Sequence, residues 1–155
     1  MDESRVLIIG DLHISDRYTG KHKNYLENCF EVLDMITESM KERKITHLII
    51  LGDWVGIGLR EKNLRKRETL LRLMRVVMEW NNITNNNVYS LRGNHDIGHK
   101  LTDFDLLLEL GLIKNVNQLD VQVARFHMFN YGEETRKIDV DDNMYNIGLF
   151  HANLL

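Results

Sequence analysis

Four short apolar runs in this chain end directly in side chains that can bind a metal ion or transfer a proton. The runs and their polar followers are residues 6–10 before Asp11 and His13, residues 48–52 before Asp53, residues 88–93 before Asn94, His95 and Asp96, and residues 147–150 before His151. Short runs rich in Ile, Leu and Val are typical of buried strands. Residues just beyond the carboxyl ends of parallel strands meet in one crevice of an open α/β sheet, so these groups are predicted to form one site.

Length and composition limit the classes of protein that the chain can belong to. Its 155 residues are enough for one domain with a real core, and the formal charge of -3 gives no general attraction to nucleic acid. The single cysteine, Cys29, excludes an intrachain disulfide and a Cys-based zinc site. No run approaches the roughly 18 apolar residues of a membrane span, and the acidic start is unlike a signal peptide. A cytoplasmic location without a membrane partner is therefore predicted, and the absence of proline among many asparagines is compatible with a phage or low-GC bacterial gene.

Helical spacing of apolar residues alternates with the strand-like runs. The sequence predicts helices over about residues 24–43, 64–80 and 103–110, the second ending at the asparagine cluster and the third having Thr102 as N-cap and Gly111 beyond its end. Further strands are predicted at 121–125, 126–131, 138–140 and 145–150. This order predicts an α/β protein whose first part is a parallel sheet with right-handed crossovers and helices on its faces.

The residues after the predicted strands suit divalent metal ions. Asp11 and His13 are two apart, so in extended backbone their side chains point the same way. The Asp53 carboxylate has two oxygens that can bridge two ions, while Asn94 offers a carbonyl oxygen and His151 an imidazole nitrogen. This mixed set suits Mn²⁺, Fe, Zn²⁺ or Mg²⁺. Two such ions about 3.5–4 Å apart can hold a phosphate and produce a bridging hydroxide from water.

His95 is assigned a different role because it is adjacent to Asn94 and so points elsewhere. Cleavage of a phosphodiester requires a proton for the leaving oxygen, and an imidazole is a suitable donor near neutral pH. His95 is therefore predicted to be the general acid, with Asp96 orienting its ring.

In order, spacing and strand context these motifs resemble those of the calcineurin-like metallophosphoesterase superfamily. The resemblance implies an α/β/β/α sandwich, of which residues 1–155 would be an amino-terminal portion. It also implies that Asp11, His13 and Asp53 hold one ion, and that Asp53, Asn94 and His151 hold the other. The superfamily's later Gly-His-x-His motif is absent, so we expect that the domain is incomplete at its carboxyl end, that another chain completes it, or that the site is depleted.

Within the superfamily, the Asn94-His95-Asp96 sequence is more similar to nucleases and phosphodiesterases than to Ser/Thr protein phosphatases. The Asp53-Trp54-Val55 loop and the long first helix, with its Asp16-Arg17 loop, are most similar to nuclease subunits that process double-strand breaks. This similarity implies DNA as the substrate, Mn²⁺ as the metal, a role in DNA repair and an SMC-like ATPase as partner. It leaves open whether cleavage is that of an exonuclease or an endonuclease.

Two other functions compete with a DNA nuclease. One is a small-molecule phosphodiesterase or phosphatase of the same fold, and the other is a non-catalytic scaffold module. Arg60 and His99 are candidates for contacting a substrate phosphate, although either could simply belong to a loop tip. The basic residues of segment 60–75 could form a nucleic-acid surface or the solvated face of a helix. Unpaired sheet edges also predict that the chain forms a homo-oligomer or depends on a missing continuation.

Overall fold

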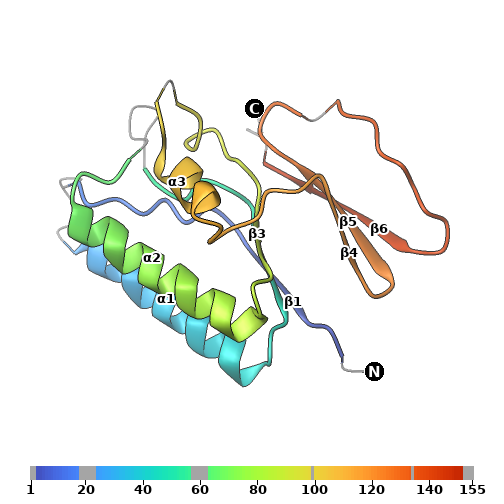
Figure 1. The fold of residues 1–155 in the computed structure, drawn as a ribbon, viewed down its shortest axis with the longest axis horizontal. Helices are drawn as coiled ribbons and strands as arrows, with labels where there is room; N and C mark the ends of the chain where they lie inside the picture. The colour runs from blue at the N-terminus through green and yellow to red at the C-terminus, as the bar shows by residue number, and fades with distance from the viewer. Residues whose placement is uncertain (1–2, 18–23, 57–62, 99, 134, 152–155) are drawn as a thin grey trace.

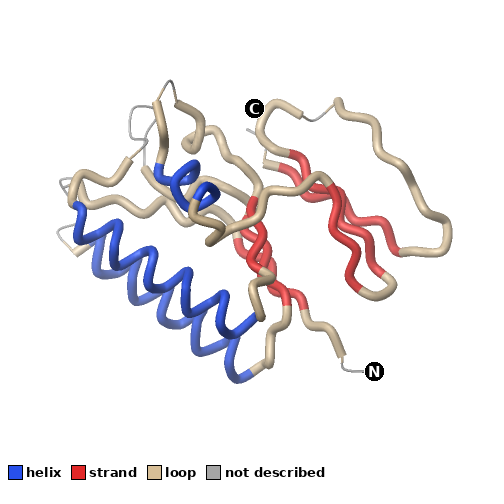
Figure 2. Tube along the Cα trace, in the orientation of Figure 1, coloured by secondary structure: helices blue, strands red, loops and turns tan. Residues whose placement is uncertain are grey.

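The computed structural model describes residues 3–17, 24–56, 63–98, 100–133 and 135–151. The elements follow in the order β1 (Val6–Ile9), α1 (Tyr25–Glu42), β2 (His47–Ile50), α2 (Arg67–Thr84), β3 (Val88–Ser90), α3 (Asp103–Glu109), β4 (Gln118–Val121), β5 (Ala124–Phe129) and β6 (Tyr145–Phe150). Figures 1 and 2 show a layer of long helices, a central sheet and a second sheet beyond it.

The central sheet is parallel and has the order β1-β2-β3. Its alternating side chains divide between two cores, as the pleat requires. Leu48 and Ile50 pack in the core under the helices, whereas Ile49 and Tyr89 pack with the second sheet. The expected α/β class is confirmed, and both faces of β2 are buried.

The sequence had led us to expect helices on both faces of this sheet. In the described residues, helices cover only one face. Helices α1 and α2 lie side by side on one face (Figure 1). Strand order follows chain order here, so successive right-handed crossovers place both helices on the same side. The other face packs against the sheet of order β4-β5-β6, in which β4 is antiparallel to β5 and β6 is parallel to it. The layers are those of a metallophosphoesterase-like sandwich without an outer helical layer in the described residues.

Several predicted boundaries were wrong for local reasons. Helix α2 continues to Thr84, because Asn81 donates its side-chain amide to the carbonyls of Val77 (2.9 Å) and Leu112 (2.7 Å) and so packs within the structure. It ends at Asn85, whose φ of 54° lies in the left-handed region. Residues 124–129 form one strand, and residues 138–140 form none. The predicted N-cap is confirmed, because Thr102 and Asp105 form a capping box at the start of α3.

Within the described part of the chain, no helix combines the length and apolar character needed to cross a membrane.

Candidate metal centre

The carboxyl ends of β1, β2, β3 and β6 surround one pocket of about 240 Å³. Its walls are formed by Asp11, His13, Leu51, Asp53, Asn94, His95, Phe150 and His151. The structure thus brings together every metal ligand proposed from the sequence, from segments as far apart as β1 and the residue after β6. These side chains therefore converge on one pocket, and their roles as metal ligands stay a prediction.

Asp53 lies at the centre of the pocket and is almost completely buried. Its Oδ2 atom is 3.4 Å from Nε2 of His151, 3.8 Å from Nε2 of His13 and 4.0 Å from Nε2 of His95. Its Oδ1 atom accepts a hydrogen bond of 2.9 Å from the backbone amide of His95. Oδ2 is thus the oxygen that faces the three imidazoles, and the expected bridging of two ions by Asp53 stays a prediction.

His13 presents a defined nitrogen to this oxygen. Its Nδ1 is 2.7 Å from the carbonyl oxygen of Gly56, which can only accept, so Nδ1 carries a proton and, in the neutral ring, Nε2 has the lone pair. Nε2 also lies 3.7 Å from Oδ2 of Asp11. The side chains converge because His13 has a φ of 47°, a tight turn rather than the extended backbone assumed from the sequence. Asp11, His13 and Asp53 stay the first ligand set that the resemblance implies, whereas the ligand atoms that all lie within 4.8 Å of one another are those of Asp11, Asp53 and His151.

His151 completes a second set in the same manner. Its Nδ1 donates to the carbonyl oxygen of Leu51 at 2.7 Å, and its Nε2 lies 2.9 Å from Oδ1 of Asn94. Nε2 of the neutral ring, the Asn94 oxygen and the Asp53 oxygen then direct three lone pairs into one space. Ligands about 2.1 Å from an ion lie about 3 Å apart in adjacent positions. The distances from His151 to Asn94 and to Asp53, together with the chemistry of the three groups, therefore fit a divalent cation.

His95 faces the same space from the third strand end. Its ring lies edge-on to that of His13 with centroids 5.1 Å apart, and it is about nine-tenths buried. Its Nδ1 atom is buried and has no hydrogen-bond partner in the part of the chain that the structure describes. His13, Asp53 and His95 could also hold an ion, so this position permits either proton donation or ligation.

Asp96 does not orient the ring of His95, contrary to expectation. Its carboxylate accepts hydrogen bonds from the backbone amides of Asp53 (2.8 Å), Gly93 (2.9 Å) and Trp54 (3.1 Å). Burial raises the pKa of Asp96 to about 6, while the amides of Gly93 and Trp54 act in the opposite direction. His95 and Asp96 are adjacent in the chain, and their side chains point to different surroundings: that of His95 lines the pocket and that of Asp96 faces backbone amides.

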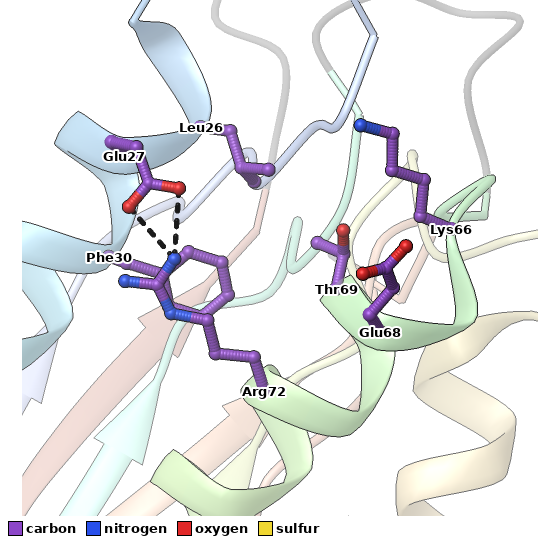
Figure 3. Close-up of a pocket in the computed structure, with 7 residues that line it drawn as sticks. All are labelled: Leu26, Glu27, Phe30, Lys66, Glu68, Thr69 and Arg72. Atoms are coloured by element: carbon purple, nitrogen blue, oxygen red, sulfur yellow. Dashed lines mark hydrogen bonds and ion pairs between the residues drawn. The ribbon is translucent and has the colours of Figure 1, made fainter.

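Other expected features have mixed outcomes. Arg60 and His99, the candidates for substrate contact, lie outside the described residues. On α2, Arg72 ion-pairs with Glu27 at 2.9 Å and stacks over the Phe30 ring in a separate pocket (Figure 3). For Arg72, the interpretation as part of the solvated face of a helix is therefore better than the interpretation as part of a nucleic-acid surface.

Sequence reasoning missed Phe150, which lines the metal pocket and is 48% exposed. It was counted only as the last residue of an apolar strand. Its position directly before His151 was the available signal, because a residue at a strand end borders whatever site the next residue enters.

A family profile described as calcineurin-like phosphoesterase matches residues 4–152, nearly the whole chain. No curated protein matches the chain significantly. The chain belongs to the calcineurin-like phosphoesterase family, whose members are metal-dependent phosphoester hydrolases. The resemblance to nuclease subunits and to partners of an SMC-like ATPase stays a prediction.

Proposed function

Because this chain is a calcineurin-like phosphoesterase, we propose that it hydrolyses phosphodiester bonds of DNA with two divalent cations, of which Mn²⁺ is our first choice. The observation that carries the hydrolytic part is the meeting of Asp11, His13, Asp53, Asn94 and His151 in one pocket, in which His13 and His151 lie beside the same oxygen of Asp53. Two bound cations would neutralise charge on the phosphate and lower the pKa of a water molecule that attacks phosphorus.

The protein's own residues position these parts. Backbone amides of Leu12 and His13 donate to the Asp53 carbonyl at 3.1 and 2.8 Å, which joins the first two strand ends. Carbonyls of Gly56 and Leu51 fix the tautomers of His13 and His151. The rings of His13 and His151 are therefore held in place by backbone groups before a cation arrives.

We assign His95 the role of proton donor to the leaving sugar oxygen. Its Nε2 is directed to the same space as Asp53 Oδ2, at 4.0 Å, so a phosphate held there would be within reach after small adjustments. A general acid typically contributes a factor of about 10²–10⁴ to the rate.

Two features support a nucleic-acid substrate over a smaller one. The Asp11 side chain is 47% exposed, so the pocket opens to the surface and a long chain can reach it. Phe150 is half exposed on the pocket wall, and Tyr131 lies edge-on to His151 with ring centroids 6.2 Å apart. Aromatic rings beside a phosphate site can stack on nucleobases.

A small-molecule phosphodiesterase is the second candidate. The described pocket lining contains no lysine or arginine, whereas a DNA channel normally follows the phosphate backbone with such residues. A scaffold role without catalysis is the third candidate, and it predicts partner binding with no hydrolysis at all.

The test compares bis-aryl phosphate, a cyclic nucleotide and linear DNA as substrates with Mn²⁺. Our proposal predicts Mn²⁺-dependent cleavage of DNA, and a fall of about 10²–10⁴-fold in kcat for His95→Ala with Mn²⁺ binding retained. His47→Ala is the matched control, since His47 lies at the opposite end of β2. Unchanged cleavage in His95→Ala would refute its role, and hydrolysis confined to the small substrates would select the second candidate.

A further inference from the structure

The loops after β2 and β3 approach each other more closely than side chains normally allow. Gly52 has a φ of 98°, and a Cβ atom placed on it would lie 2.6 Å from the backbone nitrogen of Gly93. A Cβ atom on Gly93 would in turn collide with the Asp53 carboxylate and backbone. These two loops carry Asp53 on one side and Asn94 with His95 on the other. Their separation therefore determines how far the ligands of the second candidate set are from each other.

One buried carboxylate joins the two loops. Oδ2 of Asp96 accepts from the amides of both Asp53 and Gly93, one from each loop, and Oδ1 accepts from the amide of Trp54. The Asp96 residue is only 2% exposed, so water does not compete for these bonds. Charge-assisted hydrogen bonds of this kind are stronger than those between neutral groups.

We propose that Asp96 is a positioning residue of the metal centre: its carboxylate holds the Asp53 loop and the Asn94–His95 loop at the spacing that two cations need. It acts through backbone amides and touches neither a cation nor the substrate. The proposal rests on the proposed function, because it concerns the same pair of ions.

The substitution Asp96→Asn tests this with almost no change in shape. The amide oxygen can replace only one carboxylate oxygen, so its NH₂ group must face the backbone amide of either Trp54 or both Asp53 and Gly93. Residues that support metal ligands typically change metal affinity by about 10–100-fold when mutated. We expect a fall in Mn²⁺ affinity of about 10-fold for Asp96→Asn and closer to 100-fold for Asp96→Ala, measured by calorimetry.

Asp103→Asn is the matched control. Asp103 is also buried and its carboxylate accepts a backbone amide, that of Leu64 at 2.6 Å, but it lies on α3 outside the pocket lining. It should change thermal stability as much as Asp96→Asn does and leave Mn²⁺ affinity within about twofold. The magnetic coupling between bound Mn²⁺ ions distinguishes the Asp96→Asn and Asp103→Asn variants further. In electron paramagnetic resonance, Asp96→Asn should weaken the exchange coupling between paired Mn²⁺ ions, and Asp103→Asn should not.

Hydrogen exchange of the metal-free wild-type protein provides a test that needs no variant and no activity. The amides of Asp53, Trp54 and Gly93 should be protected together, as one unit. Fast exchange of all three would overturn the proposal, and so would wild-type Mn²⁺ affinity in a folded Asp96→Ala or an equal loss in Asp103→Asn. If the wild type binds no Mn²⁺, the proposed function fails, while the exchange experiment still decides whether Asp96 holds the loops.

Discussion

At the scale of single residues, the two carboxylate oxygens of Asp53 have different surroundings in the candidate centre. Asp53 has a φ of 50°, follows Gly52 in a sharp turn, and gives one oxygen to a backbone amide and the other to the pocket. The residue types at the strand ends predicted this site, because oxygen and imidazole ligands after parallel strands converge. The different roles of the two carboxylate oxygens were not predictable, since they depend on the backbone amide of His95, in a distant loop, lying 2.9 Å from Oδ1.

The close approach at Gly93 leads to a prediction about a single methyl group. In Gly93→Ala the added Cβ would press on Asp53, so we expect a loss of about 1–3 kcal/mol in the free energy of unfolding together with weaker Mn²⁺ binding. Gly10→Ala is the matched control, because Gly10 also precedes a proposed ligand but a Cβ there meets nothing within 4 Å. Urea denaturation and calorimetry of both variants measure the difference. Equal behaviour of the two variants would mean that the loop contact is unimportant.

At the level of elements, periodicity and strand-end position predicted β1, β2, β3, β6 and all three helices to within a few residues. The failures occurred where tertiary contacts override local preference. Asn81 is normally a helix terminator, but its amide finds two carbonyl partners and α2 continues past it. Residues 138–140 have strand-like composition yet lie in a loop, since no neighbouring strand of the described structure pairs with them.

The start of β2 provides a pH-dependent prediction. Burial, aided by the charge of Lys114, lowers the pKa of His47 below its usual value of about 6.5. The folded protein then binds this proton less tightly than the unfolded chain. The contribution of His47 to stability is therefore complete above about pH 6.5 and is lost as the pH falls below that value. We expect His47→Gln to reduce the difference in unfolding free energy between pH 8 and pH 5, measured in urea. A variant with the full wild-type pH dependence would contradict this assignment.

At the scale of the whole molecule, the second sheet has one edge, at β6, that no strand of the described residues covers. Strand β6 is an edge strand without a charged residue, and Tyr145 and Phe150 are 73% and 48% exposed. Uncharged edges of this kind pair with other strands. We expect the chain to associate with a second copy as its concentration rises, and Tyr145→Lys to shift it toward the monomer. Light scattering after gel filtration measures this, with Val140→Lys as control on an exposed loop position. A wild-type protein that stays monomeric at every concentration would refute the expectation.

The convergence of β1, β2, β3 and β6 on one pocket is what makes the chain a candidate hydrolase, and it can be tested directly. Crystals soaked in Mn²⁺ should show two peaks in anomalous difference maps at the manganese absorption edge. One peak should lie among Asp11, His13 and Asp53, and the other among Asp53, Asn94 and His151. Strong diffraction data with no anomalous peak in this pocket, or with peaks only elsewhere on the molecule, would contradict the account.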